Sequence, residues 1–129
     1  MLLIVAALER SQLSDLLELA KVLSLDCLVE VRNWQELDRA LYCDAEIIGI
    51  NNRDLNTLNI SLDISLNLLK DIPDDRIKVS ESGINSRAHV ETLEAAGADA
   101  ILVGTAIMKA EDIGARIDEL MGHPSMMPD

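Results

Sequence analysis

The sequence predicts an α/β fold built around a parallel β-sheet. Short apolar runs alternate along the chain with longer stretches in which leucine and alanine recur at helical spacing. Strands that alternate with helices pair in parallel, through right-handed crossovers. With 49% hydrophobic residues among 129, the chain has enough apolar side chains for one core, and a single domain is expected.

Five strands are predicted from the short apolar runs. The first, over residues 2–8, is uninterrupted, as expected of a strand covered on both faces. The next four are rich in β-branched and aliphatic residues. They are predicted over residues 26–31, 46–51, 77–80 and 100–103.

The helices are predicted from amphipathic spacing and from residues that cap helix ends. A serine or asparagine side chain can accept a hydrogen bond from the first helical turn. The predicted N-caps are Ser11, Asn33, Ser61 and Ser86. Gly97 provides a left-handed stop for the fourth helix. A short turn over residues 105–109 and a last helix over residues 111–121 complete five β–α units.

Charge and composition argue against several kinds of partner. Acidic residues number 23 against 11 lysines and arginines, which gives a net charge of −12. This charge repels nucleic acid and anionic membrane surfaces, although backbone N–H groups can still bind a phosphate locally. Only 2% of the residues are aromatic, too few for stacking on nucleic-acid bases. No apolar run approaches the roughly 18 residues of a membrane span, and residues 1–8 lack the basic residues of a signal peptide.

The cysteines and histidines form no familiar metal-binding or disulfide motif. Cys27 and Cys43 are separated by 16 positions, without a Cys-x-x-Cys pair, which fits a reducing cytoplasm. His89 and His123 stand apart from any ligand motif, although two histidines and two cysteines can in principle bind zinc. We expect no metal and no cofactor.

Polar residues gather where the predicted strands end, which is where parallel α/β folds bind ligands. A buried, unpaired Glu30 within CLVEV would cost several kcal/mol or take up a proton. Asn51, Arg53 and Glu81 stand at the ends of later strands. The alternatives are an ion pair for Glu30, a solvated helix start for Glu81, a loop-bridging amide for Asn51 and a surface position for Arg53.

Two architectures fit this element order: an open doubly wound sheet, or part of a (β/α)₈ barrel. Length favours the open sheet, because a barrel needs about 250 residues. Two glycine turns favour the barrel. Gly83 and Gly104, with Ser82 and Thr105 beside them, follow apolar strands where backbone N–H groups can approach a phosphate, as the last two loops of many barrels do. The alternative is that both glycines serve the turns alone.

Five segments carry a resemblance to a known family. LLIVAAL, LVEV, IIGINNRDL, VSESGI and ADAILVGTAIM resemble, in order and spacing, the carboxyl-terminal part of indole-3-glycerol phosphate synthase. The pair IIGINNRDL and VSESGI is specific, whereas GADAILVGTA also resembles other phosphate-binding barrels. The resemblance implies a partial (β/α)₈ TIM barrel over residues 1–121, with five β–α units that resemble strands four to eight. Residues 122–129 are expected to form a flexible tail.

The resemblance also implies a reaction and a site. The family enzyme is a lyase of tryptophan biosynthesis, which converts 1-(2-carboxyphenylamino)-1-deoxyribulose 5-phosphate to indole-3-glycerol phosphate, carbon dioxide and water. Glu30 resembles its acid–base carboxylate, for which a raised pKa in an apolar barrel mouth would suit proton removal as water leaves. The substrate-binding positions would be Asn51, Arg53, Glu81 and Ser82. The phosphate-binding positions would be Gly83, Gly104 and Thr105.

The amino-terminal part of the family barrel finds no match in this sequence. That part carries the lysine that acts as general acid, so we expect a truncated, split or internally initiated product that is inactive alone. Five strands cannot close a barrel, and the open sheet is expected to drive homo-oligomerisation or pairing with an amino-terminal half-barrel. Two other functions stay open: a non-catalytic phosphate-binding or oligomerisation module, and another phosphate-sugar barrel enzyme such as a phosphoribosylanthranilate isomerase type.

Two helix ends depart from the family pattern. Family members usually carry glycine after the first two of these helices, where this chain has Ser24 and Asp44. A non-glycine residue in the left-handed conformation costs about 0.5–1 kcal/mol. The alternative is that these helices end without a left-handed residue.

Overall fold

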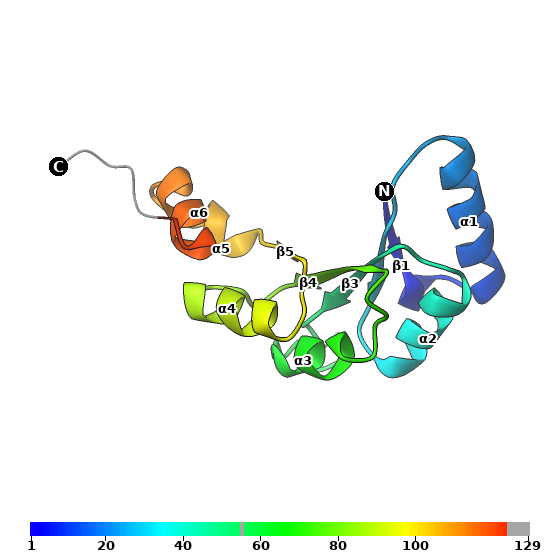
Figure 1. Ribbon diagram of the computed structural model, residues 1–129, viewed down its shortest axis with the longest axis horizontal. Helices are drawn as coiled ribbons and strands as arrows, with labels where there is room; N and C mark the ends of the chain where they lie inside the picture. Colours follow the sequence, from blue (N-terminus) through cyan, green and yellow to red (C-terminus); the bar gives the residue numbers. More distant parts are fainter. Residues whose placement is uncertain (55, 124–129) are drawn as a thin grey trace.

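Five parallel strands form one sheet in the computed structural model, which describes residues 1–54 and 56–123. The strands are β1 (Leu2–Ile4), β2 (Leu28–Val31), β3 (Ile47–Asn51), β4 (Ile77–Glu81) and β5 (Ala100–Leu102). They pair in chain order, from β1 to β5 (Figure 1). A doubly wound sheet reverses its strand order at a switch point, whereas a barrel does not. The open doubly wound alternative is therefore wrong, and the fold is a partial TIM-barrel-like unit.

The helices lie on one side of the sheet and at its two ends (Figure 1). They are the 3₁₀ helix η1 (Val5–Ala7) and the α-helices α1 (Arg10–Val22), α2 (Trp34–Tyr42), α3 (Asp63–Leu69), α4 (Arg87–Ala95), α5 (Thr105–Met108) and α6 (Ile113–Met121). Helices α2, α3 and α4 run along one face, while α1 stands at one end of the molecule and α5 and α6 at the other (Figure 1). Sequential right-handed crossovers place successive helices on the same face.

The core lies between the sheet and these helices. Side chains alternate between the two faces of a strand, so every second residue points toward the helices. On this face Val29, Val31, Ile48 and Ile50 are fully buried, and Leu3 is 6% exposed. The core is aliphatic, as the scarcity of aromatic residues requires.

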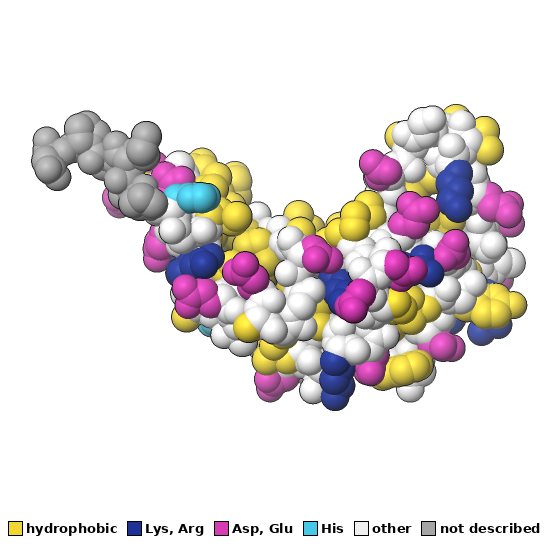
Figure 2. All heavy atoms as spheres, in the orientation of Figure 1, with side chains coloured by type: hydrophobic (Ala, Val, Ile, Leu, Met, Phe, Trp, Pro, Cys, Tyr) yellow, Lys and Arg dark blue, Asp and Glu magenta, His cyan; other side chains and the backbone are white. Residues whose placement is uncertain are grey.

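The opposite face of the sheet is open. Four of its aliphatic side chains, Leu2, Ile4, Ile77 and Leu102, are between 37% and 52% exposed. Figure 2 shows a hollow between the two raised ends of the molecule, with hydrophobic side chains along it. The expectation that the first strand is covered on both faces is therefore wrong, whereas the expected open apolar face is present.

Helix starts agree with the sequence at two places and differ at two others. Asn33 Oδ1 accepts a hydrogen bond from the Glu36 amide at 2.9 Å, and Ser86 Oγ from the His89 amide at 3.3 Å. Ser11 is not a cap, because α1 begins earlier, with Glu9 and Gln12 capping each other's backbone amides. Ser61 lies one residue before the N-cap position of α3 and accepts instead from the Asp63 amide.

Element boundaries also shift at both ends of the chain. The strand predicted over residues 2–8 ends at Ile4, because the backbone coils into η1. The last helix starts at Ile113 rather than 111, since Asp112 caps it through a 3.0 Å bond from the Ala115 amide. Of the tail predicted over residues 122–129, positions 124–129 lie outside the described residues. Among the helices that are described, none is long and apolar enough to cross a membrane.

Left-handed residues end four of the described helices, including Gly122 with φ +73° after α6. Gly97 has φ +106° after α4, as predicted. Ser24 after α1 and Asp44 after α2 have φ +56° and +60°, so the alternative without left-handed residues is wrong. Asp44 is held by an ion pair with Arg76 at 2.7 Å, whereas the Ser24 side chain forms no hydrogen bond with another described residue. Ser24 thus carries the strain without compensation.

We predict that Ser24→Gly stabilises the protein by about 0.5–1 kcal/mol, because glycine adopts the left-handed conformation without a Cβ clash. Urea unfolding measures the change. The matched control is Ser14→Gly within α1, which we expect to destabilise by about 0.5 kcal/mol through lower helix propensity. Equal destabilisation by both substitutions would contradict the strain at Ser24.

Candidate functional site

A hollow of about 550 Å³ lies at the carboxyl ends of β2 to β5. All eight residues that the sequence singled out line it: Glu30, Asn51, Arg53, Glu81, Ser82, Gly83, Gly104 and Thr105. Residues far apart in the sequence meet there because parallel strands all end at the same edge of the sheet. The predicted site is therefore one place in the molecule.

The two carboxylates belong to the open face of the sheet. Glu30 on β2 is in register with Gly49 on β3, and Asn51 on β3 with Glu81 on β4. Because side chains two residues apart share a face, Glu30 and Glu81 both project toward the barrel interior. Glu30 is 9% exposed and Glu81 only 3%. The sheet thus carries two largely buried acids side by side, across β3.

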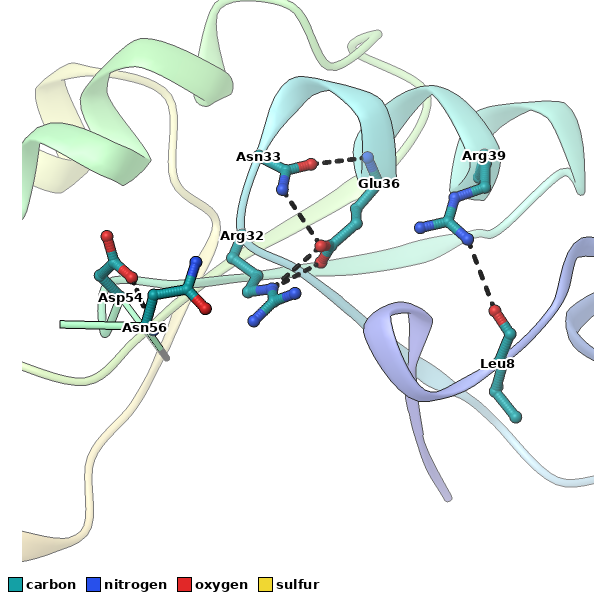
Figure 3. Close-up of polar contacts among 7 residues, drawn as sticks. All are labelled: Leu8, Arg32, Asn33, Glu36, Arg39, Asp54 and Asn56. Atoms are coloured by element: carbon teal, nitrogen blue, oxygen red, sulfur yellow. Dashed lines mark hydrogen bonds and ion pairs between the residues drawn. The ribbon is translucent and has the colours of Figure 1, made fainter. Parts of the chain in front are cut away.

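Glu30 has no ion-pair partner in the described part of the chain. The nearest arginine in sequence, Arg32, bonds instead to Glu36 through its Nε, at 2.9 Å (Figure 3). Asn33 Nδ2 donates to the same Glu36 carboxylate at 3.1 Å. The ion-pair alternative for Glu30 is therefore wrong, since the local arginine is committed to the start of α2.

The helix that follows β2 is also tied to the residue that ends η1. Figure 3 shows Arg39 of α2 donating to the carbonyl oxygen of Leu8, at 3.5 Å. In the loop after β3, Asp54 Oδ1 accepts from the Asn56 amide at 2.8 Å and closes a tight turn (Figure 3). These bonds fix the backbone locally at the end of η1 and in the loop after β3.

Glu81 is the residue with the strongly raised pKa. The pKa of Glu81 is raised to about 8, and the largest cause is burial of the carboxyl group. The neighbouring Glu30 raises this pKa further, both as a hydrogen-bond partner and as a like charge. Its Oε1 is buried and has no hydrogen-bond partner within the described residues. The solvated helix-start alternative is wrong, because Glu81 is the last residue of β4.

Asn51 and Ser82 are joined at the rim of the hollow. Asn51 Oδ1 accepts from Ser82 Oγ at 3.0 Å and from the Arg53 amide at 3.0 Å. The side-chain oxygen of Asn51 therefore bridges two loops, as the alternative for this residue proposed. Its Nδ2 has no hydrogen-bond partner among the described residues. Arg53 is exposed, as the surface alternative has it, yet it lines the hollow. One amide N–H group and one guanidinium are therefore available to a ligand.

The two glycine turns differ in conformation. Gly83 has φ +74° and follows Ser82 at φ +72°, so two left-handed residues stand in sequence after β4. A Cβ on Gly83 would overlap Ile60 Cγ2. Gly104 has an ordinary φ of −117°, and a Cβ there would meet nothing within 4 Å. At position 83, the left-handed backbone and the lack of space for a Cβ both require glycine. At position 104 neither does, and the missing side chain leaves the backbone before Thr105 open to a ligand.

Asn52 is a structural residue of the site that the sequence reasoning did not single out. It is fully buried, and its Nδ2 donates to Ser80 Oγ at 3.0 Å and to the Ser82 carbonyl at 3.1 Å. Its Oδ1 accepts from the backbone amide and the hydroxyl of Ser65, at 3.1 and 2.7 Å. A buried network satisfied in this way fixes the turn at Ser82 to β3 and α3. Two adjacent asparagines at a strand end gave no signal to tell which one faces the core.

Gly49 is the second residue that sequence reasoning missed. A glycine inside an apolar strand often marks a place where another group approaches the backbone closely. IIGIN carries that signal.

The described residues contain no group of three or more histidine, cysteine, aspartate or glutamate side chains placed to hold a metal ion. Cys27 and Cys43 line a different hollow, at the amino ends of β2 and β3, and both are free thiols. The zinc alternative for the two histidines and two cysteines gains no support from this arrangement.

Comparison with known proteins gives both a family and a fold. The family described as indole-3-glycerol phosphate synthase matches residues 1–120. Thiamine phosphate pyrophosphorylase from Pyrococcus furiosus is 20% identical with a TM-score of 0.73, over 94% of this chain and 56% of that one. A chain of the Amycolatopsis orientalis BexX/CysO complex is 18% identical with a TM-score of 0.58, over 94% and 54%. At these identities the structures show the fold alone, and this chain spans about half of each.

We predict that the free energy of unfolding falls as the pH rises from about 4.5 to about 8. The folded protein holds the Glu81 proton more tightly than the unfolded chain, so the contribution is present at low pH and lost as Glu81 ionises. Glu81→Gln should flatten this part of the pH profile by about 1–2 kcal/mol, a value reduced from the full shift because the sheet face around Glu81 is open.

Urea unfolding at a series of pH values measures this effect. Glu18→Gln on the outside of α1 is the matched control and should keep the parent profile. A Glu81→Gln profile parallel to the parent across this range would contradict the assigned shift.

Proposed function

The chain belongs to the indole-3-glycerol phosphate synthase family, and we propose that it supplies the carboxyl-terminal part of that enzyme's barrel and most of its substrate site. One observation carries the proposal. The eight positions that match the family's site residues line a single hollow of about 550 Å³ at the carboxyl ends of the strands. Because this chain covers only about half of each solved structure compared above, the activity proposed is that of the whole barrel.

The proposed reaction closes an indole ring on 1-(2-carboxyphenylamino)-1-deoxyribulose 5-phosphate. A ring carbon bonds to the ketose carbon as the ketose oxygen takes up a proton, and carbon dioxide leaves. Loss of the hydroxyl as water and of a ring proton then gives indole-3-glycerol phosphate. Glu30 is the proposed base for that last proton. Glu81, whose pKa of about 8 keeps it protonated at neutral pH, is a hydrogen-bond donor to the substrate.

The remaining positions bind the substrate in this proposal. Asn51 offers its unpaired Nδ2 and Arg53 its exposed guanidinium to the oxygens of the sugar and carboxylate. Ser82 lies beside Asn51. The phosphate binds at the backbone of Gly83, Gly104 and Thr105, where two strand ends turn into helices.

The ketose oxygen also needs a proton donor placed beside it, and the lysine that serves this role in the family has no match in this chain. Arg53 is the one lysine or arginine among the described residues that line the hollow. The general acid therefore comes from the amino-terminal β–α units in this proposal, and the chain alone is inactive. The free thiols of Cys27 and Cys43 fit a reducing cytoplasm as its location.

We predict that turnover of the carboxyphenylamino-deoxyribulose phosphate requires the complementing part of the barrel. The full chain is assayed alone, and then with a polypeptide that carries the first three β–α units of a family member. Turnover is expected only in the mixture. Glu30→Gln should lower it by at least about 100-fold through loss of the base, whereas Glu18→Gln should leave it unchanged.

The other outcomes decide between the alternatives. Turnover by the chain alone refutes the missing-acid argument. Binding of the phosphate ester without turnover in either condition favours a non-catalytic phosphate-binding module. Turnover of a different sugar phosphate by the mixture favours another phosphate-sugar barrel enzyme.

We also propose that the open face of the sheet is covered by a partner. Beside the exposed residues of the sheet, α1 leaves Leu19, Val22 and Leu23 between 52% and 80% exposed at one end of the molecule. At the other end α6 leaves Ile113, Ile117 and Met121 between 41% and 50% exposed. Each open edge thus consists of an unpaired strand and an apolar helix stripe, the two layers that a further β–α unit would cover.

Charge favours an amino-terminal half-barrel over a second copy as that partner. Two copies would bring two Glu30–Glu81 pairs and two net charges of −12 together. Static light scattering of the chain at micromolar concentration should give self-associated species, and equimolar three-unit polypeptide should convert them to a one-to-one complex. A sharp monomer under both conditions would count against a docking role for this face.

A further inference from the structure

Gly49 occupies a position where a glycine is costly. It lies within β3, the central strand, and is in register with Glu30 on β2 and Val79 on β4. Glycine weakens a strand because it loses more backbone freedom on folding and packs no side chain. Its φ is not among the positive values of this chain. The backbone therefore does not demand glycine, and the reason must lie in the space above its α-carbon.

That space is filled by the carboxyl group of Glu81. A Cβ built on Gly49 would overlap Oε1 of Glu81 and lie 3.1 Å from its Cδ. It would also lie 3.0 Å from Cδ1 of Leu28, on the other neighbouring strand. Glu81 stands on β4 opposite Asn51, two residues beyond Gly49. Its side chain therefore leans back across β3, over the bare α-carbon, in the direction of Glu30.

We propose that Gly49 is a positioning residue of the site, whose missing side chain leaves the space in which the Glu81 carboxyl faces Glu30 so that the two carboxyls bind one proton between them. The proposal deepens the function proposed above, and rests on it, because that function uses Glu30 as a base and Glu81 as a hydrogen-bond donor. Its evidence is the packing over Gly49 rather than the reaction.

The surroundings leave Glu81 no other charged group to pair with on this side. Of the described residues that line the hollow, the ionisable ones are Glu30, Arg53 and Glu81. Arg53 is exposed and forms no ion pair with Glu81. The groups contributed by β3, β5 and the turn after β4 are neutral, among them Asn51, Ser82 and Leu102. The charge that governs Glu81 is thus that of Glu30 across Gly49, which raises the pKa in addition to burial.

The test is Gly49→Ala in the full chain. The added methyl group displaces the Glu81 carboxyl from β3 and separates it from Glu30. Titration of the side-chain carboxyl carbons by NMR should give a Glu81 midpoint near 8 in the parent, and one at least one pH unit lower in Gly49→Ala. The signals are assigned with Glu81→Gln and Glu30→Gln. Gly114→Ala on α6 is the matched control, since its Cβ would come no closer than 3.6 Å to Asp112 Oδ1.

A folded Gly49→Ala chain in which Glu81 titrates as in the parent overturns the proposal, as does a parent in which Glu81 titrates in the ordinary range. Should Gly49→Ala fail to fold by circular dichroism, Glu81→Asp replaces it. That change shortens the side chain by one methylene without adding an atom to β3, and the new carboxyl should titrate at least one unit below the parent midpoint.

The same variant separates this proposal from the proposed function. In the mixture that restores turnover, Gly49→Ala is expected to lower kcat at least 10-fold with a smaller change in KM, because Asn51, Arg53 and the phosphate-binding backbone stay in place while the Glu81 carboxyl moves. Absence of turnover in the parent mixture would reject the function, while the NMR titration would still decide the role of Gly49.

Discussion

The parallel register of β2, β3 and β4 is the constraint on which the site depends. It sets Glu30 beside Gly49 and Asn51 beside Glu81, all on the open face. Because side chains alternate, a slip of one residue would turn both carboxylates toward the helices. The register is held from the other face, where Ile50 and its neighbours must be buried under α2 and α3. Packing on one side of the sheet therefore positions the chemistry on the other.

Features that oppose stability are concentrated at the carboxyl rim. Two acids are buried side by side, Gly49 interrupts the central strand, and Ser82 holds a left-handed backbone without being glycine. Each is costly for folding, and such strain is typical of functional sites. The Asn52 network compensates directly beneath them, because every hydrogen-bonding group of its side chain is satisfied.

The open face links this strained site to the rest of a barrel. In a closed barrel the inner residues of all strands pack against one another, and the helices form a continuous outer ring. Here both layers stop at the same two edges, with exposed aliphatic residues on the sheet and on α1 and α6. The ionisable pair lies at the rim of this face, so whatever covers the sheet also changes the polarity around Glu30 and Glu81.

The sequence by itself determined the order and type of the elements, since apolar periodicity and caps such as Asn33 and Ser86 act locally. It also determined which residues stand at strand ends, and parallel pairing then required them to share one rim. Boundaries such as the end of β1 depended on how the chain packs. Only the tertiary structure decided that burial beside Glu30 raises the pKa of Glu81, that Asn52 rather than Asn51 faces the core, and that Gly49 makes room for a carboxyl. These properties depend on burial and on neighbours from other strands, which no local pattern in the sequence encodes.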